Sequence, residues 1–230
     1  MYLIRGINNI DLFRTRHSEV STVATIGNFD GLHLGHQQIL KTMQKEADFH
    51  GLWKLIVFTE PHAQEFFAEA AGLDASKPPR ILPWQEKVRK MKELGVELAF
   101  FLKFNNQLRS MTPRNFLDKV LLRLNIKKLI LGDDFRFGAN REGDFNLLKK
   151  WGSENSIEVS NTETFKMEGE RVSSTRIRKA LTNNDFELAT KLLGRPFTYA
   201  GKVVYGQQLG AQLGILTANL GLPKNKLPIS

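Results

Sequence analysis

A short glycine-rich turn carries two histidines, His33 and His36. It reads GNFDGLHLGH over residues 27–36, follows the apolar run 22–26, and leads into a helical pattern expected to begin at about His36. At a helix N-terminus, free amides and the positive end of the helix dipole attract phosphate, and imidazole N–H groups can donate to its oxygens. The turn therefore predicts a site for the triphosphate of a nucleotide. A zinc site is the alternative, and it requires further His, Asp or Glu ligands.

A second expected helix start offers hydroxyl groups and a guanidinium. Ser174 and Thr175 precede a helical pattern whose apolar residues are Ile177, Ala180 and Leu181, and Arg178 lies near its beginning. A guanidinium matches phosphate oxygens at two points, so these residues predict a cradle for the β- and γ-phosphates of ATP. The alternative is a simple capping motif on a basic helix.

Two acidic residues, Asp133 and Asp134, follow the fourth expected strand. An aspartate at the carboxyl end of a strand in a nucleotide-binding fold meets ribose, metal-bound water or adenine. The aromatic residues beside them, Phe135 and Phe137, serve either as core residues or as ligand contacts. Asp30 in the first turn also has two interpretations, because it either contacts the nucleotide or braces the turn.

The elements that must hold these residues alternate between short apolar runs and amphipathic stretches. The expected strands are 22–26, 52–59, 98–102 and 128–131, and the expected helices are 36–47, 83–94 and 112–124. Thr112 and Pro113 are typical of an N-cap and a first helical residue, and Gly95 is typical of a helix end. Strands joined by crossover helices predict an α/β fold with a mostly parallel sheet, whose ligands bind outside the carboxyl ends of the strands.

The composition changes near Gly194. Beyond it, residues 198–205 alternate like an exposed strand and glycines become frequent. We therefore expect one domain over residues 1–194 and a second, incomplete one over residues 195–230. Residues 68–79 are small and polar enough to form a mobile loop.

The overall composition excludes several classes of protein. The chain has 230 residues, of which 41% are hydrophobic, and no cysteine, so disulfides, thiolate metal sites and cysteine nucleophiles are excluded. No stretch approaches the roughly 18 apolar residues of a membrane span, and no targeting segment is recognisable. We expect a soluble, cytoplasmic protein with no membrane partner.

The formal charge of +9 fits two kinds of partner, nucleic acid or phosphorylated substrates. The basic residues are spread over helical segments rather than gathered into one tract, as at Lys87, Arg89, Lys90 and Lys92. That spread is typical of solvated helix faces. Charge alone does not separate the two kinds of partner.

Four separate strings resemble a known family. They are GNFDGLHLGHQ (27–37), FTEPH (58–62) with EFF (65–67), GDDFRFG (132–138) and VSSTRIR (172–178). Their order and spacing resemble those of the prokaryotic bifunctional riboflavin kinase/FMN adenylyltransferases (FAD synthetases), the flavin branch of the HxGH nucleotidyltransferase superfamily. The resemblance implies a Rossmann-like nucleotidyltransferase that transfers AMP from ATP to FMN and forms FAD. One departure is Ala63, where the family usually has a proline.

The resemblance also implies roles for individual residues. The catalytic residues it implies are Asn28, beside the reacting phosphates, with His33, His36 and Arg178. Those implied on the ATP side are Gly27, Phe29, Asp30, Gly35, Asp134, Ser174 and Thr175. Those implied on the flavin side are Phe58, Pro61, His62, Phe135 and Arg136. Mg²⁺ is expected to arrive on the ATP phosphates rather than in a dedicated protein cage, and no nucleic-acid partner is expected.

The tail resembles the opening of a second module. Residues 201–223, GKVVYGQQLGAQLGILTANLGLP, are similar to the start of the family's riboflavin kinase module, whose nucleotide and metal contacts the resemblance places at Thr217 and Asn219. The family's usual arginine, phenylalanine and proline are replaced by Ala211, Ile215 and Leu216. Residues 195–230 are too few to close a kinase barrel. We expect a truncated, β-rich start of this module without riboflavin kinase activity.

Two alternatives of other classes stay open. Another HxGH nucleotidyltransferase, making a coenzyme A or NAD precursor, would share the histidine turn, but the loop 132–138 and the sequence 217–219 speak against it. A basic nucleic-acid-binding module predicts micromolar, strongly salt-dependent binding of duplex.

Overall fold

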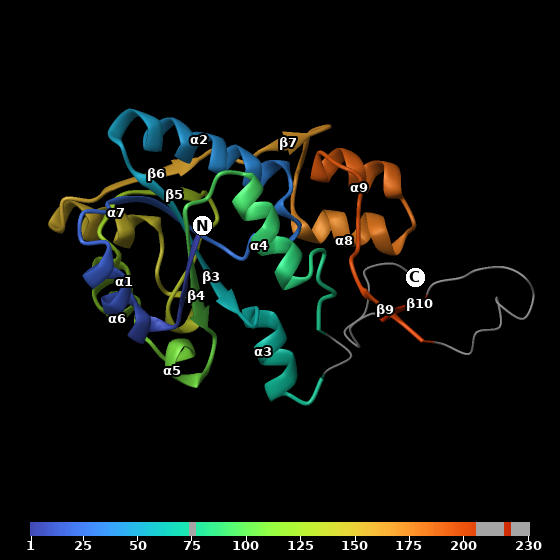
Figure 1. The fold of residues 1–230 in the computed structure, drawn as a ribbon, viewed down its shortest axis with the longest axis horizontal. Coiled ribbons are helices and arrows are strands. Elements are labelled where there is room, and N and C mark those ends of the chain that lie inside the picture. Colours follow the sequence, from blue (N-terminus) through green and yellow to red (C-terminus); the bar gives the residue numbers. More distant parts are fainter. Residues whose placement is uncertain (74–76, 206–218, 222–230) are drawn as a thin grey trace, which may run out of the picture.

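A parallel sheet forms the centre of the computed structural model, which describes residues 1–73, 77–205 and 219–221. Within this part, the largest sheet has six strands in the order β1-β4-β3-β2-β5-β6 (Figure 1). Every neighbouring pair in it is parallel. The strands are β1 (Tyr2–Arg5), β2 (Thr22–Ile26), β3 (Trp53–Glu60), β4 (Leu98–Lys103), β5 (Ile126–Gly132) and β6 (Glu158–Thr162). The predicted α/β fold with a parallel sheet is confirmed.

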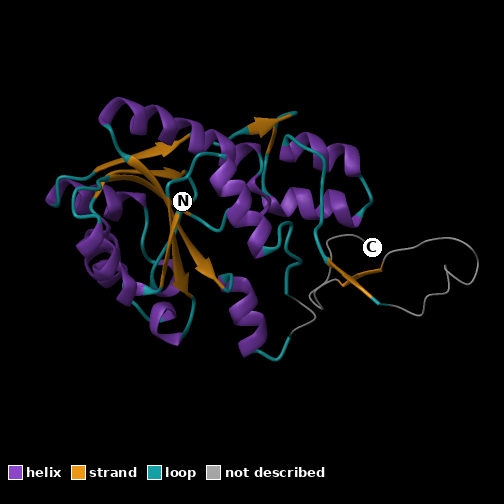
Figure 2. Cartoon of the chain, viewed as in Figure 1, coloured by secondary structure: helices purple, strands orange, loops and turns teal. Residues whose placement is uncertain are grey.

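Helices cover both faces of this sheet (Figure 2). One face packs against α1, α6 and α7 and the other against α2 and α4, with a separate hydrophobic core on each side. The helices are α1 (Ile10–Arg16), α2 (Leu34–His50), α3 (Ala63–Ala70), α4 (Trp84–Glu93), α5 (Asn106–Arg109), α6 (Pro113–Phe116), α7 (Phe145–Glu154), α8 (Ser174–Thr182) and α9 (Phe186–Leu193). Shorter 3₁₀ or π-helical turns are η1 (Ile7–Asn9), η2 (Asp30–Leu32), η4 (Leu117–Leu121), η5 (Leu122–Leu124) and η6 (Ala139–Arg141).

The four expected strands are present because each contains a run of at least three consecutive buried residues. β2 has the predicted bounds, and the other three differ from the prediction by one or two residues at an end. The edge strands β1 and β6 give no such signal, since one side chain of β1 and none of β6 is buried. Buried strands read as apolar runs, whereas exposed edge strands do not.

The three expected helices are also present. In the third, the Thr112 side chain accepts from the amide of Asn115 at 3.3 Å and Pro113 is the first helical residue, as predicted. That helix is not uniform, because the π-helical η4 follows α6. The predicted loop over residues 68–79 is partly wrong, since α3 extends to Ala70; residues 74–76 lie outside the described part.

A third hydrophobic cluster joins α8 and α9 to the segment around Ile81. Before α8, β7 (Lys166–Met167) and β8 (Glu170–Arg171) form an antiparallel hairpin. Arg176 on α8 donates to the carbonyl of Met167 at 3.0 Å and pairs with Glu170 at 3.1 Å. The hairpin is therefore fixed to the start of α8.

The first residues after Gly194 still contact the preceding α/β part of the fold. Arg195 donates to the carbonyl of Gly31 at 2.9 Å, and Phe197 packs against the cluster of α8 and α9. Further on, β9 (Lys202–Val204) pairs antiparallel with β10 (Asn219–Gly221). The boundary at Gly194 stays a prediction, and these contacts place the packing of the first domain a few residues beyond it.

Candidate active site

The predicted phosphate-binding turn follows the carboxyl end of β2 and leads into α2. β2 is an interior strand of the sheet, between β3 and β5. Phe29 (φ 50°), Gly31 (φ 80°) and Leu32 (φ 44°) all have left-handed backbone conformations. At Gly31, a Cβ atom would lie 3.0 Å from Ile81, so both conformation and space favour glycine. Such a turn persists only where the surrounding structure holds it.

Four peptide carbonyls of this turn accept hydrogen bonds from side chains. The donors are Lys87 Nζ to Asn28 (3.0 Å), Ser174 Oγ to Asp30 (2.9 Å), Arg195 Nη2 to Gly31 (2.9 Å) and Gln37 Nε2 to Leu32 (2.9 Å). In a trans peptide the C=O and the next N–H point in opposite directions, so each bond turns the following N–H away from its donor. The first amides of α2 also lack intrahelical partners. Of the N–H groups that follow these carbonyls, that of Leu32 donates to the Phe29 carbonyl at 3.3 Å. Those of Phe29, Gly31 and His33, together with the first amides of α2, suit an anion.

Asp30 braces the turn from inside the protein. Its buried carboxylate accepts from the amides of Ile81 at 3.1 Å and Leu82 at 3.2 Å, and it pairs with Arg178 at 2.5 Å. Arg178 also donates through Nε to the carbonyl of Pro79 at 2.7 Å. The geometry favours the bracing interpretation of Asp30. It also limits the prediction that the Arg178 guanidinium binds phosphate at two points, because two of its nitrogens already donate to protein oxygens.

His33 and His36 stack on one another, with ring centroids 3.7 Å apart. His33 is the N-cap of α2, and its Nδ1 accepts from the amide of His36 at 3.4 Å. A neutral His33 therefore carries its proton on Nε2. The Nδ1 atom of His36 is buried and has no hydrogen-bond partner among the described residues. The helix begins at Leu34, two residues before the predicted start.

Both imidazoles are uncharged at neutral pH. Burial lowers the pKa of His33 to about 4, against an opposing effect of Asp30. Burial also lowers the pKa of His36 well below its ordinary value, and the charges of Lys87 and Arg171 add to this effect. The pair can thus offer N–H donors to phosphate without being cationic beforehand.

Two glycines allow close approach around these rings. A Cβ atom at Gly35 would lie 3.2 Å from His33 Nδ1 and 3.4 Å from the carbonyl of Val172. A Cβ atom at Gly27 would lie 3.2 Å from the ring of Phe29. The structure therefore gives both predicted residues a steric reason to be glycine.

The start of α8 reaches the same turn, as the sequence predicts. Ser173 caps this helix by accepting from the amide of Arg176 at 3.2 Å, and Ser174 holds the Asp30 carbonyl. Thr175 is exposed. The capping and bracing contacts are present, whereas phosphate binding by Ser174 and Thr175 stays a prediction.

Arg171, which the sequence reasoning missed, lies between the acidic loop and the histidines. It pairs with Asp134 at 2.8 Å, and this hydrogen bond lowers the pKa of Asp134. Its charge also lowers the pKa of His33 and His36. Asp134 is thereby linked to the turn. The signal that could have found Arg171 is its place directly before the string that starts at Val172.

Hydrogen bonds fix both the backbone and the side chain of Asn28. Its backbone carbonyl accepts from Lys87, and its side-chain oxygen accepts from the hydroxyl of Thr59 at 3.0 Å. The interpretation of Lys87 as part of a solvated face is wrong, because this side chain is buried. Charge patterning alone does not show which lysine of a helix faces a buried carbonyl.

Two aromatic residues predicted as ligand contacts lie in the core. Phe58 is 1% exposed and packs on Phe101 with ring centroids 4.3 Å apart, and Phe29 is equally buried in the same cluster. The predictions that the Phe58 side chain contacts flavin and the Phe29 side chain contacts ATP are therefore corrected. A central strand and the turn after it place large apolar side chains inside the protein.

The predicted flavin-side loop joins β3 to α3. His62 caps α3, since its Nδ1 accepts from the amide of Gln64 at 3.1 Å and its own amide donates to Glu65 at 3.0 Å. Burial lowers the pKa of His62 to about 4. Pro61 is half-buried beside it, and Ala63 is the first residue of α3. This capping box orders the loop without the family's second proline.

An aromatic cluster stands beside this loop. Phe66 and Phe67 on α3 contact Phe104 after β4 edge to face, with ring centroids 5.3 to 5.8 Å apart. Phe67 is 44% exposed, and the Arg109 guanidinium lies 5.2 Å from its ring centre. The string EFF contains two of these residues, but sequence reasoning gave them no role.

Phe135 and Arg136 sit further along the carboxyl edge of the sheet. Phe135 is half-buried and stacks on the buried Phe137 at 5.6 Å, whereas Arg136 is exposed and lies 3.5 Å from Asp144. Their flavin contacts stay predictions. Of the predicted kinase residues, Thr217 lies outside the described residues, and Asn219 is the first residue of β10.

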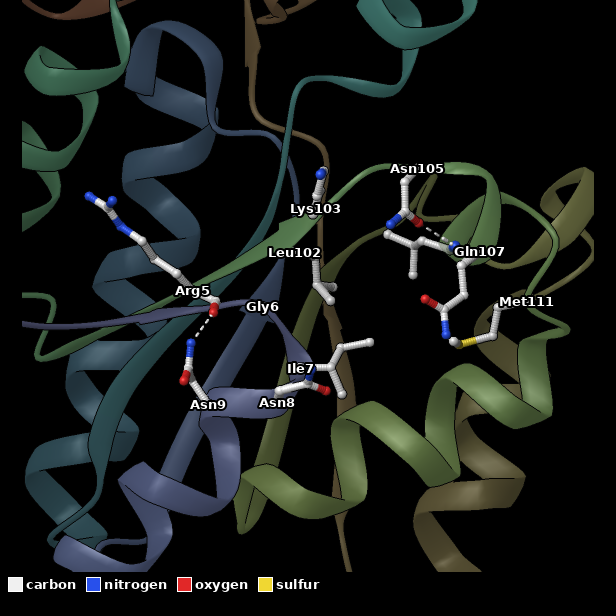
Figure 3. A pocket seen from close by; sticks show the side chains of 11 residues that line it. Arg5, Gly6, Ile7, Asn8, Asn9, Leu102, Lys103, Asn105, Gln107 and Met111 are labelled. Atoms are coloured by element: carbon white, nitrogen blue, oxygen red, sulfur yellow. Dashed lines mark hydrogen bonds between the residues drawn. The ribbon is translucent and has the colours of Figure 1, made fainter.

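A cavity of about 290 Å³ opens at the carboxyl ends of β1 and β4 (Figure 3). Ile7, Leu102 and Met111 give it an apolar lining, to which Asn105 and Gln107 add amide groups. One strand, β3, lies between β4 and β2, the strand that leads into the histidine turn. None of the predicted site residues lines this cavity.

Two features are absent from the described part of the chain. Within it, no group of three or more His, Asp or Glu side chains could hold a metal ion, so the zinc alternative gains no third ligand there. No helix in residues 1–73, 77–205 and 219–221 is long and apolar enough to cross a membrane.

The sheet and the histidine turn define an α/β fold of the nucleotidyltransferase type. Pantoate-beta-alanine ligase from Francisella tularensis, complexed with beta-gamma ATP and beta-alanine, shares this fold (TM-score 0.52, 16% identity, 84% of this chain and 78% of that one). The FAD synthetase model matches residues 15–176 and the riboflavin kinase model residues 193–230. The chain belongs to the FAD synthetase family of nucleotidyltransferases.

Individual relatives agree with this assignment. The bifunctional riboflavin kinase/FMN adenylyltransferase of Escherichia coli K12 is 40% identical over 230 residues, which are the whole of this chain and 71% of that protein. A solved structure titled macrolide-efflux protein, from Streptococcus pneumoniae, is similar with a TM-score of 0.78 at 28% identity, over 98% of this chain and 70% of that one.

Because the folded protein buries neutral histidines, its free energy of unfolding should decrease as the pH is lowered from about 6.5 to about 4. The pKa of His33 is about 4 in the folded protein against 6.5 as its ordinary value, so the unfolded chain binds more protons in this window. His33 alone should remove about 2 kcal/mol at about pH 5. Urea denaturation at several pH values measures this loss.

His33→Gln should flatten that pH dependence, and His50→Gln, at the exposed far end of α2, is the matched control and should leave it unchanged. An unchanged slope in His33→Gln would contradict a buried, neutral His33.

Proposed function

We propose that this protein transfers AMP from ATP to FMN, forming FAD and releasing pyrophosphate. The observation that carries the proposal is the turn after β2, where two stacked neutral histidines meet a helix start and four carbonyls are held by side chains. That arrangement leaves donors for the phosphates of a nucleotide. Membership in the FAD synthetase family supports FMN as the acceptor.

The chemistry needs positioning and charge neutralisation. An oxygen of the FMN phosphate attacks the α-phosphorus of ATP in line; the new P–O bond forms, and the bond to the β-phosphate breaks. Pyrophosphate leaves with the Mg²⁺ that ATP brings. An ionised phosphate needs no general base, so His33 and His36 serve as hydrogen-bond donors to phosphate oxygens.

The cations nearby are already paired with protein groups. Arg178 neutralises Asp30, and Arg171 neutralises Asp134. Arg171 is the more exposed of the two, at 46% of its side chain against 17%. Arg171 can therefore exchange its carboxylate for a phosphate, whereas Arg178 keeps the turn in shape.

The acceptor ring is assigned to the aromatic cluster of Phe66, Phe67 and Phe104, next to the loop of Pro61 and His62. Exposed aromatic faces stack on a planar ring, and Arg109 adds a positive charge. This assignment replaces Phe58, whose side chain is buried. It keeps the flavin at the carboxyl ends of β3 and β4, on the same edge of the sheet as the nucleotide turn.

FMN, ATP and Mg²⁺ should give FAD with the wild-type chain. His36→Ala should lower kcat about 10²–10³-fold, the usual loss for one preorganised donor. The variant should still fold, although it also loses the ring contacts of His36 with His33 and Phe29, and thermal unfolding measures that loss separately. Product fluorescence after chromatography measures FAD.

His50→Ala, on the same helix, is the matched control and should retain wild-type turnover. The proposal is contradicted if folded wild-type protein makes no FAD but adenylylates a coenzyme A or NAD precursor. That result would support the alternative hypothesis of another HxGH nucleotidyltransferase.

Substitutions at Phe67 and Phe58 distinguish a phenylalanine of the proposed flavin-binding cluster from one of the hydrophobic core. Phe67→Leu should raise KM for FMN about 3–10-fold, leave KM for ATP unchanged and barely alter stability, because it removes an exposed stacking face. Phe58→Leu should instead lower the free energy of unfolding by about 1 kcal/mol, because it disturbs a packed core. Steady-state kinetics with each substrate varied, together with urea denaturation, distinguish the two. A selective FMN effect from Phe58→Leu but none from Phe67→Leu refutes the assignment.

Riboflavin kinase activity is predicted to be absent from these 230 residues. The prediction comes from the replacement of the family's arginine and proline by Ala211 and Leu216, which lie outside the described residues. Riboflavin, ATP and Mg²⁺ should yield no FMN above a control without enzyme, while a parallel tube with FMN yields FAD. FMN formed above that control contradicts the prediction.

A further inference from the structure

Lys87 is a buried lysine at the centre of the candidate site. It lies on α4, and only 6% of the residue is exposed. Its Nζ donates to the carbonyl of Asn28 at 3.0 Å and lies 5.4 Å from the ring centre of Phe58. A lysine is rarely buried to this extent unless its charge has partners.

The charges that face this amine come from both substrate sides. Burial lowers the pKa of Lys87, while the carboxylates of Asp30, Glu60 and Glu65 oppose that shift and Arg80 adds to it. The charge of Lys87 in turn lowers the pKa of His36 and of His62. One ammonium group therefore acts on the nucleotide turn and on the acceptor loop.

We infer that Lys87 is a positioning residue for adenylyl transfer, which holds the Asn28 peptide and supplies the buried positive charge of the site. The inference rests on the proposed function. Because Lys87 holds the Asn28 carbonyl, the N–H of Phe29 points away from it, toward the side where the turn presents its amides. The Thr59 hydroxyl fixes the side-chain oxygen of the same asparagine, so its NH₂ group is also oriented.

The same charge has an electrostatic consequence for the reaction. A buried cation behind the turn favours the negative charge that the transferred phosphate carries in the transition state. After burial and the neighbouring His33, it also contributes to the lowered pKa of His36. A lysine that merely filled space would do neither.

The test uses the full chain with Lys87→Met, Lys87→Arg and Lys87→Gln. Lys92→Met is the control, because Lys92 is an exposed lysine of the same helix. Three measurements are made: thermal unfolding, kcat and KM with each substrate varied, and NMR titration of labelled histidines in the substrate-free protein. The titration does not depend on any activity, so it tests Lys87 even if the proposed function fails.

Lys87→Met should lower kcat about 10–100-fold with KM for ATP changed less than about threefold, and the pKa of His36 should rise. Lys87→Arg should recover most of the kcat, whereas Lys87→Gln, which is uncharged, should not. Lys92→Met should match wild type in all three measurements.

The inference is overturned if folded Lys87→Met has the kcat of the wild type. It is also overturned if the pKa of His36 in that variant equals that in the wild type. If Lys87→Met does not fold, the comparison of Lys87→Arg with Lys87→Gln decides: equal kcat in these two overturns the role of the charge, and a tenfold advantage of arginine supports it.

Discussion

Four carbonyls of the turn between β2 and α2 accept hydrogen bonds from side chains outside the turn, and much of the architecture follows from that requirement. An unpaired buried carbonyl costs about 1–3 kcal/mol, and here side chains from α4, α8, α2 and the segment after α9 supply the donors. The left-handed residues of the turn add to the need for support. Helices far apart in the sequence are thus fixed around one short turn.

Burial of the histidines follows from the same close packing and sets their chemistry. His33 lies against Gly35 and stacks on His36, so neither ring is well hydrated and neither is charged. A neutral imidazole can donate one proton without repelling the cations around it.

The sequence predicts the centre of the fold better than its edges. β2 is a buried apolar run and the histidine turn has a distinctive composition, so both are recognisable. β1 and β6 expose most of their side chains and give no such pattern. Phe58 and Lys87 were misread for a shared reason: residue type does not show which way a side chain points, and here tertiary packing places an aromatic in the core and a cation beneath a carbonyl.

The segment Pro79–Leu82 shows how the two halves of the site are joined. Its amides hold the carboxylate of Asp30, and the Pro79 carbonyl accepts from Arg178, which fixes the nucleotide turn. Between them, Arg80 pairs with Glu60 at 2.6 Å and with Glu65 at 2.5 Å, which fixes the loop and helix on the acceptor side. Four residues therefore carry hydrogen bonds both to the histidine turn and to the loop and helix after β3, and they fix these two segments relative to each other. In the proposed reaction this fixed separation would set the distance between nucleotide and acceptor, on which an in-line transfer depends.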